Sequence, residues 1–461
     1  MSDSELCNVS EIVNHEHECI PEEYDKYMAE MQRMNKKHAI VMLGSDCLVM
    51  NEFFDPIHKR HDVNFSTFGA FKNRYLNRRV INPWRSASAR KTRDAGSMWL
   101  ESRIRREYER VVFDPSQSVG KNYYNMFKGF NVRPDKRGDW STLRSHIFEV
   151  LCEKNKKLDH YLMSWMARII QQPGGDKPGT AIVFKGIQGC GKGTLANALS
   201  FLIGAHARHI LQAAHLTGQF NSTLKDALFV FCDEITWGGN KQAEGILKGL
   251  ITEPTISIEH KGKDVAEMDS HLNVMIASNN DWVIPAGLEE RRFCVMSCSP
   301  EKAGNRAYFD RIYHELKHKN GYGRMMYDLM HYDYSDIDLR TIPRTRALFD
   351  QILASMSPVH KFWYQILADE TLDPQEDYWR GDIETTRLYN LYQDFSVGIG
   401  HSYRLIPNQF ARKLKELCPD MRKMRVRADD LERKMHYVFP DLQVCRNQFE
   451  QAISMKIDWS L

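Results

Sequence analysis

The sequence lacks the features that mark secreted, membrane-spanning or fibrous proteins. No stretch of its 461 residues approaches the roughly 18 consecutive uncharged apolar residues of a membrane span. The first residues, MSDSELCNVSEIVNHEHEC, contain neither the basic nor the apolar segment of a secretory signal. The chain also has no internal repeat and no low-complexity tract. With 42% hydrophobic and 27% charged residues, the composition predicts a soluble protein of two to four domains with no membrane partner.

The cysteine spacing argues against both a disulfide framework and a zinc site. None of the ten cysteines forms a C-x-x-C pair, and Cys294 and Cys298 have no matching second pair. Several, such as Cys232 in LFVFCDE, sit inside apolar runs, where a reduced thiol packs as a small hydrophobic group. We therefore expect a cytoplasmic, reducing location inside a host cell. The segment His15–Cys19 (HEHEC) could bind a metal, although an acidic tail more often stays solvated.

The net charge of +3 conceals three charged regions. Residues 1–36 have nine acids and three bases, which gives −6. Residues 57–110 have fourteen bases and five acids (+9) with interleaved aromatic residues such as Phe65 and Trp84, and residues 404–434 have ten bases and five acids (+5). Clustered bases neutralise phosphates and aromatic rings stack on nucleobases, so either basic region is a candidate nucleic-acid surface or an ordinary solvated one.

Apolar periodicity predicts several elements ahead of the central region. We expect a helix from Pro21 to about Asn35, a buried strand at 39–43 and a helix at 94–110. Residues 141–172 have helical spacing and read as two helices that meet around Asn155. A Pro/Gly-rich linker at 173–179 follows.

The strongest motif is GIQGCGKGT, which lies between an apolar strand at 180–184 and an apolar helix. This is the context of a phosphate-binding loop, in which glycines let successive backbone N–H groups point at phosphate oxygens and a lysine reaches the β- and γ-phosphates. A glycine occupies the usual hydroxyl position, so the next residue, Thr194, is the predicted Mg²⁺ ligand. The predicted ATP-binding residues are Gly186, Gly189, Gly191, Lys192, Gly193 and Thr194.

Two later strands end in polar residues suited to phosphate chemistry. The strand at 227–232 ends in Asp233 and Glu234, which we expect to bind Mg²⁺ and to orient an attacking water, respectively. The strand at 272–277 is followed by Asn279, a predicted sensor of the γ-phosphate. Arg292, with Arg291 as the second choice, is the predicted arginine finger acting on a neighbouring subunit.

Residues 255–264 predict a β-hairpin with a basic tip. We expect Lys261 and Lys263 at this tip to grip DNA inside the pore of a ring. An ordinary solvated turn is the alternative interpretation.

Together, GIQGCGKGT, LFVFCDE, IEHKGKD, IASNN and EERRF resemble superfamily 3 helicases, most closely the virus and phage branch related to the poxvirus primase-helicase. The resemblance covers residues 95–355 and weakens beyond them. It implies a hexameric ring of AAA+ domains that hydrolyses ATP with Mg²⁺. It also implies three-prime to five-prime travel on single-stranded or forked DNA, with a separate primase or polymerase as partner.

The predicted fold class is therefore an α/β AAA+ P-loop core with an N-terminal mostly helical domain and a C-terminal winged-helix-like domain. The expected domains are listed by residue range: 1–36 acidic segment, 37–172 basic and mostly helical domain, 173–300 ATPase core, 301–355 helical lid, and 356–461 winged-helix-like domain.

The predicted function is an ATP-driven DNA helicase that replicates a virus, phage or mobile element. One alternative is an origin-binding initiator or loader that does not unwind DNA processively. Another is a P-loop nucleotide kinase, which the G-K-G-T sequence allows. The adjacent acids Asp233 and Glu234 count against the kinase, because a kinase does not need the second one.

Overall fold

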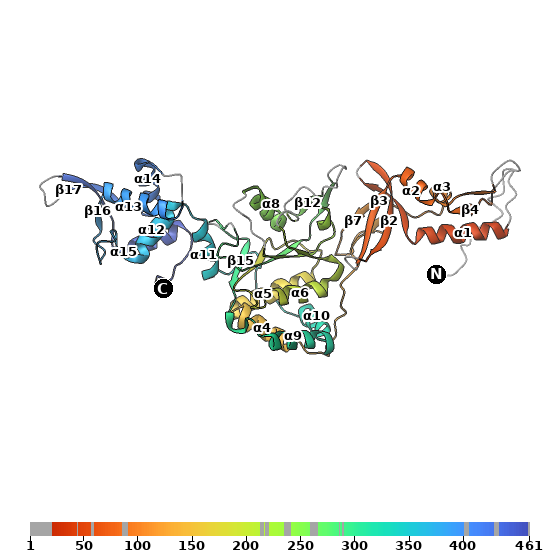
Figure 1. The fold of residues 1–461 in the computed structure, drawn as a ribbon, viewed down its shortest axis with the longest axis horizontal. Helices are drawn as coiled ribbons and strands as arrows, with labels where there is room; N and C mark the ends of the chain where they lie inside the picture. Colours follow the sequence, from red (N-terminus) through yellow and green to blue (C-terminus); the bar gives the residue numbers. More distant parts are fainter. Residues whose placement is uncertain are drawn as a thin grey trace.

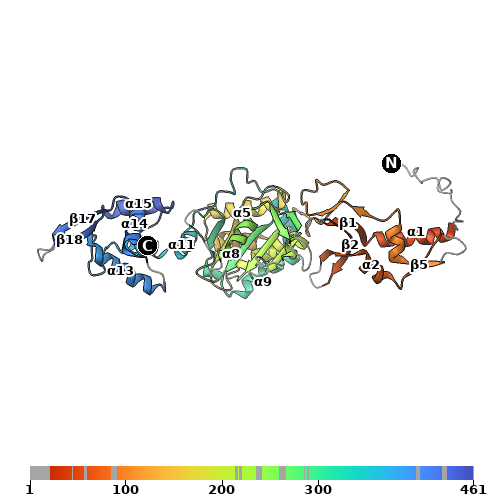
Figure 2. The same cartoon turned by 90° about the horizontal axis from the view of Figure 1, so that it is seen from above.

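A computed structural model of the chain shows three lobes in a row, with the termini in the two outer lobes (Figures 1 and 2). The structure describes residues 21–43, 45–56, 60–84, 91–212, 216, 221–234, 241–258, 266–284, 286–287, 290–400, 405–427 and 433–459. In this part of the chain, no helix has both the length and the apolar character that a membrane crossing requires.

The N-terminal lobe is built on a four-stranded sheet with the order β3-β2-β1-β6. Its elements are α1 (Pro21–Asn35), β1 (His38–Leu43), β2 (Asp46–Asp55), β3 (Arg60–Ser66), α2 (Phe68–Tyr75), β4 (Arg79–Ile81), β5 (Thr92–Asp94), α3 (Ala95–Glu101) and β6 (Glu107–Tyr108). Side chains from α1, α2, α3 and the strands form a separate apolar cluster that includes the buried Trp99. The predicted helix at 21–35 and the predicted strand at 39–43 are confirmed.

Two expectations for this lobe are corrected. Residues 37–172 are not mostly helical in their first half, because β1, β2 and β3 form antiparallel pairs there. The predicted helix at 94–110 ends at Glu101, and the chain then turns so that β6 pairs with β1 in parallel. Short basic segments such as Arg103–Arg106 have no apolar spacing to hold a helix on a core.

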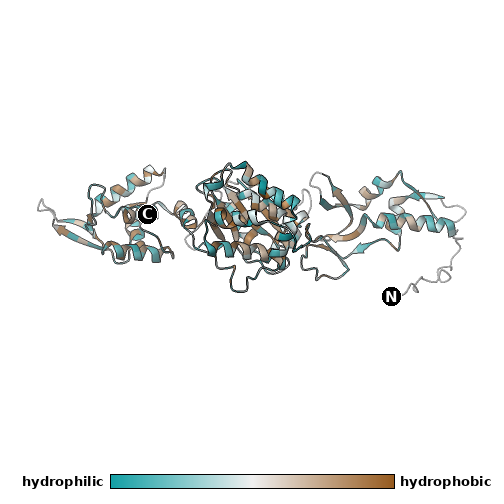
Figure 3. Ribbon diagram, turned by 90° about the horizontal axis from the view of Figure 1, so that it is seen from below, coloured by the Kyte–Doolittle hydropathy of each residue, from teal (hydrophilic) through white to brown (hydrophobic). Residues whose placement is uncertain are grey.

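The central lobe contains a five-stranded parallel sheet with the order β10-β11-β14-β9-β15. Its strands are β9 (Ala181–Lys185), β10 (Ala207–Ile210), β11 (Phe229–Asp233), β14 (Asn273–Ser278) and β15 (Phe293–Ser297). Apart from the edge strand β10, these strands are short, almost entirely apolar and buried, as expected for a parallel sheet covered on both faces. Figure 3 shows the same apolar strands in brown between more polar helices.

Helices cover the central sheet on both sides (Figure 1). The other elements of this lobe are β7 (Arg110–Val112), β8 (Tyr123–Asn125), α4 (Ser141–His146), the π-helix η2 (Ile147–Leu151), α5 (Lys156–Gln171), α6 (Lys192–Ile203), the 3₁₀ turns η3 (Gly204–His206), η4 (Ser222–Leu224) and η5 (Pro300–Lys302), α8 (Lys241–Thr252), β12 (Thr255–Ile258), β13 (Ala266–Asp269), α9 (Arg306–His318) and α10 (Gly321–Met330). The two predicted helices that meet at Asn155 are confirmed, with Asn155 capping α5. They belong to the central lobe, since Trp165 of α5 packs against Phe229 of β11.

The third lobe comes after helix α11, which links it to the central lobe. The linking helix and the elements of the third lobe are α11 (Arg346–Ser355), α12 (Pro358–Asp369), β16 (Asp382–Glu384), α13 (Thr385–Gly398), α14 (Pro407–Leu417), β17 (Arg422–Arg427), β18 (Arg433–Val438) and α15 (Leu442–Ala452). The three strands form an antiparallel sheet with the order β16-β18-β17. The winged-helix-like assignment of this lobe and the AAA+ assignment of the core stay predictions.

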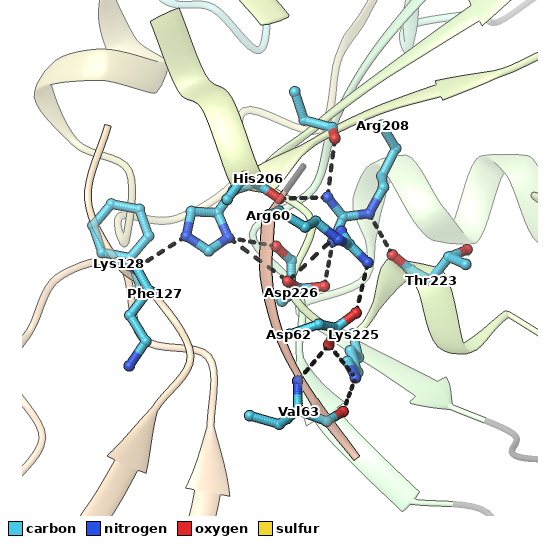
Figure 4. Close-up of polar contacts among 12 residues, drawn as sticks. Arg60, Asp62, Val63, Phe127, Lys128, His206, Arg208, Thr223, Lys225 and Asp226 are labelled. Atoms are coloured by element: carbon cyan, nitrogen blue, oxygen red, sulfur yellow. Dashed lines mark hydrogen bonds and ion pairs between the residues drawn. The ribbon is translucent and has the colours of Figure 1, made fainter. Parts of the chain in front are cut away.

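A network of buried charges joins the N-terminal lobe to the central lobe (Figure 4). Asp226 forms an ion pair with Arg208 of β10 and lies 4.0 Å from Arg60 of β3. Lys225 lies 3.0 Å from Asp62 of β3 and donates a hydrogen bond to the carbonyl oxygen of Val63. The hairpin that carries β3 is therefore fixed to the edge of the central sheet by opposite charges.

Candidate functional site

The loop between β9 and α6 contains two glycines in a left-handed conformation and leads directly into a helix. Gly189 and Gly191 adopt positive φ angles of 79° and 96°, which side chains with a Cβ atom rarely adopt. Gly191 caps α6, so the loop ends at the positive end of a 12-residue helix. Backbone N–H groups and the helix end together favour an anion at this position.

Lys192 lies inside the loop and is almost completely buried, with 6% of its surface exposed. Its Nζ donates hydrogen bonds to the carbonyl oxygens of Gly186 (2.6 Å) and Ile187 (3.0 Å) and to Oδ1 of Asn279 (2.6 Å). These three acceptors are neutral, and the Nζ atom also lies 3.9 Å from Sγ of Cys190. Lys192 has no carboxylate partner among the described residues, and a buried ammonium group without a carboxylate is a ready site for an anion.

The polar residues predicted at the ends of β11 and β14 lie beside Lys192. Because the strands are parallel, their carboxyl ends and the loop lie at the same end of the sheet. The Asn279 amide, besides accepting from Lys192, donates a hydrogen bond to the carboxylate of Glu234. A polar chain therefore runs from Lys192 through Asn279 to Glu234.

Glu234 has a strained backbone. Its φ angle is 55°, and its N–H donates to the carbonyl oxygen of Ala277 in β14. A non-glycine residue in this region is uncommon and costs free energy unless its surroundings hold it. The strain turns the chain at the end of β11 so that the side chain reaches Asn279.

Asp233 and Thr194 are the predicted metal ligands. The Asp233 side chain ends β11 and is 34% exposed, whereas Thr194, in the first turn of α6, is only 7% exposed. Carboxylate and hydroxyl oxygens are the donors that Mg²⁺ accepts, usually together with water and phosphate oxygens. The described residues hold no cluster of three or more His, Cys, Asp and Glu side chains suited to a metal. The pair therefore fits a metal that is held jointly with a nucleotide.

His209 of β10 was missed by the sequence analysis. Its Nε2 lies 3.6 Å from the Asp233 carboxylate, and its ring stacks on Phe231 with centroids 5.0 Å apart. The strand ARHI is too short and too polar to predict as part of the sheet. Only the strand order places His209 beside Asp233.

The structure does not bring Arg291 and Arg292 to this site. Arg292 directly precedes β15, and its carbonyl oxygen accepts from the N–H of Ala181 at the start of β9. Both arginines therefore lie at the amino ends of the strands, whereas the loop lies at the carboxyl ends. The buried carboxylate of Glu290 accepts hydrogen bonds from the backbone N–H groups of both arginines. Their role toward a neighbouring subunit stays a prediction.

Other predicted positions fall outside the described residues. The hairpin at 255–264 is confirmed as β12 and β13, but its tip, with Lys261 and Lys263, lies outside the described part of the chain. The same holds for the candidate metal segment His15–Cys19. Gly193 is within the described residues, and the nearest atom to a Cβ atom placed on it would belong to Phe231. The position therefore has room for a side chain.

Comparisons with known proteins find a family model within the central lobe and a relative from a phage. A model described as a family of unknown function, DUF5906, matches residues 184–292. This range includes the loop between β9 and α6 and the polar residues at the ends of β11 and β14. A DNA primase-polymerase of Nitratiruptor phage NrS-1 is 29% identical over 201 residues, which cover 41% of this chain. The chain spans 27% of the length of that relative.

Solved structures match over a longer part of the chain. The apo structure of the NrS-1 C terminal region (305-718) has a TM-score of 0.57 at 17% identity, and covers 85% of this chain and 96% of that one. An A form apo structure of the same region gives the same TM-score and covers 97% of that chain. At this identity the likeness shows a shared fold.

These findings correct the predicted function. The relative is a DNA primase-polymerase and the matched structures are of the NrS-1 C terminal region, so neither comparison is with a helicase. The prediction of an ATP-driven superfamily 3 helicase is therefore wrong, and its initiator and kinase alternatives gain no support. The comparisons give no support for a hexamer or for a separate primase either. A place in phage DNA replication agrees with the relative.

Proposed function

We propose that this chain is a nucleoside triphosphate-binding component of phage-type DNA replication, equivalent to the C-terminal region of a primase-polymerase. The observation that carries the proposal is the buried Lys192 ammonium group, which contacts backbone and amide oxygens and the Cys190 sulfur but no carboxylate among the described residues, and lies in a loop of positive-φ glycines. The relative and the structural likeness support the replication context.

Each residue of the site has a distinct task in this proposal. Lys192 and the N–H groups at the start of α6 bind the β- and γ-phosphates. Asp233 and Thr194 would hold Mg²⁺, which would neutralise phosphate charge and orient the triphosphate. Glu234, fixed by the Asn279 amide, is placed to accept a proton from a group that attacks the terminal phosphate.

The proposal is tested by linkage between nucleotide and template binding. We expect the wild-type protein to bind ATP with Mg²⁺ and to change its affinity for a single-stranded DNA template several-fold when nucleotide is present. Fluorescence anisotropy of a labelled template, with and without nucleotide, measures both effects.

Lys192→Ala is the control for this experiment. It should bind template with unchanged affinity whether or not nucleotide is added. If the wild-type protein binds nucleotide but no template under any condition, the replication role is contradicted and only the nucleotide site remains.

A further inference from the structure

A cavity of about 620 Å³ lies beside the phosphate-binding loop. One wall comes from α4 and η2, ahead of β9, and the other from η5, Asn305 and the start of α9, beyond β15. Its volume is within the range of small-molecule sites, roughly 300–1,000 Å³. The first wall was predicted only as helical packing, and neither wall was assigned a function from the sequence.

The walls of this cavity touch the phosphate-binding loop directly. The N–H of Gly304 donates to the carbonyl oxygen of Gly189 (3.4 Å). A Cβ atom on Gly191 would lie 2.5 Å from the ring of His146 and 2.7 Å from that of Phe309. The residues next to these three in the chain line the cavity: Ser145 precedes His146, Asn305 follows Gly304, and Tyr308 precedes Phe309. A nucleotide with its phosphates in the loop therefore has this cavity within reach.

The first wall presents two hydroxyls and a carboxylate on one helical face. Ser141, Ser145 and Glu149 lie four residues apart, and all three line the cavity. Glu149 falls in the π-helix η2, a conformation that is rare and is often found at functional sites. Glu149 forms no ion pair with a described residue. Its carboxylate is free to accept hydrogen bonds from hydroxyl groups.

The second wall presents an aromatic ring between two cations. Lys302 Nζ and the Arg311 guanidinium lie 5.8 and 5.7 Å from the centroid of the Tyr308 ring. The Tyr308 hydroxyl lies 3.3 Å from Nδ1 of His146, the residue whose ring packs against Gly191 of the loop. An aromatic ring with hydrogen-bond donors around it suits a nucleobase, whose faces stack and whose edges carry acceptors.

We propose that this cavity holds the nucleoside of the bound triphosphate and selects a ribonucleotide over a deoxyribonucleotide. Glu149 accepts a hydrogen bond from the ribose 2′-hydroxyl, while Tyr308 and Arg311 contact the base. This inference rests on the proposed function, because the phosphates must occupy the loop. A site that binds a hydroxyl group through a charged acceptor discriminates against the analogue that lacks it.

The experiment compares three ligands: ATP, dATP and inorganic tripolyphosphate, each with Mg²⁺. By isothermal titration we expect the wild-type protein to bind ATP about tenfold more tightly than dATP. Glu149→Ala should weaken ATP binding until the ratio is within about twofold, with tripolyphosphate binding unchanged. Glu153→Ala removes a carboxylate that does not line the cavity and should keep the wild-type ratio.

The possible failures separate the two proposals. Equal binding of ATP and dATP by the wild-type protein, or an unchanged ratio in Glu149→Ala, would overturn the ribonucleotide site while leaving the loop intact. Tripolyphosphate binding monitors folding of the variant, since it needs only the loop. If Lys192→Ala binds tripolyphosphate as well as the wild-type protein does, the proposed function itself fails.

Discussion

At the residue scale, the site depends on one side chain that serves two partners. The Asn279 amide accepts from Lys192 and donates to Glu234, so it holds a cation and an anion apart and in place. Direct contact between Lys192 and Glu234 would neutralise the charge on which phosphate binding depends. The neutral side chain between them keeps the lysine available.

Replacing Asn279 tests this role. In Asn279→Asp the new carboxylate would lie 2.6 Å from Lys192 Nζ, compete with phosphate, and weaken nucleotide binding by at least about tenfold. Asn279→Ala should have a smaller effect, because it removes a hydrogen bond without adding a charge. Nucleotide titrations of both variants measure the difference, and equal affinities would contradict a role for the neutral amide.

At the element scale, the loop and α6 depend on Gly191. The sequence motif includes this glycine but does not show why it is needed. Gly191 has a φ angle of 96°, and a Cβ atom there would meet His146 and Phe309 at 2.5 and 2.7 Å. At Gly193 the nearest atom to such a Cβ is 4.0 Å away, in Phe231.

The two glycines form a matched pair for mutagenesis. We expect Gly191→Ala to lower the free energy of unfolding by about 2 kcal/mol or more, through strain and overpacking. Gly193→Ala should raise it slightly, by up to about 1 kcal/mol, since alanine favours the helix. Urea denaturation compares them, and a neutral Gly191→Ala would show that the loop geometry is not required for stability.

Burial of His146 predicts acid sensitivity of the same region. Burial lowers the pKa of His146 to about 4, and the nearby Gly191 backbone partly offsets this effect. Burial also lowers the pKa of His38, in the N-terminal lobe, to about 4. The unfolded chain takes up protons near pH 6.5 but the folded chain does not, so both histidines stabilise the fold above pH 6.5 and this stability is lost as the pH falls toward 4.

The pH dependence of unfolding checks this account. The free energy of unfolding should fall between pH 6.5 and 4, with a contribution from His146 of up to about 3 kcal/mol. His146→Gln, which does not titrate, should flatten the slope in this range, leaving the part due to the other histidines whose pKa burial lowers, which are His38, His206, His271 and His360. A slope identical to that of the wild-type protein would contradict the neutral, buried state of His146.

Much of the central lobe could be predicted because its signals are local. The strand before GIQGCGKGT and the strands ending in Asp233 and before Asn279 are apolar runs, and the structure confirms them as β9, β11 and β14. His209 could not be found, since its place beside Asp233 depends on the pairing of β10 with β11. The sheet of the N-terminal lobe was missed because β2 and β3 mix polar and apolar residues without a regular period.

At the scale of the whole molecule, the buried charges at the first junction lie where the main apolar cluster extends from the central lobe into the N-terminal lobe through Val41, Met50 and Val63. Asp226 is 5% exposed and pairs with Arg208, the residue before His209 in β10. The same short strand therefore contacts Asp226, which faces Arg60 of the N-terminal lobe, through Arg208, and it contacts the Asp233 carboxylate through His209. This arrangement places the junction one residue from the proposed nucleotide site.

Removing Asp226 tests the junction. Asp226→Ala leaves Arg208 buried without its carboxylate and should cost about 3 kcal/mol or more of unfolding free energy. Hydrogen exchange should rise in β3 and β10. Glu376→Ala, which breaks an exposed pair with Arg380, is the control and should change stability by less than about 1 kcal/mol. Similar effects of the two variants would contradict a structural role for the buried network.

The central claim is that the loop around Lys192 binds a nucleoside triphosphate, and isothermal titration of Mg²⁺-ATP into the wild-type protein and Lys192→Ala tests it most directly. The account predicts saturable one-site binding by the wild-type protein and at least a hundredfold loss of affinity in the variant, as expected for removing a buried cation that faces phosphate. Equal heats and affinities for the two proteins would contradict it.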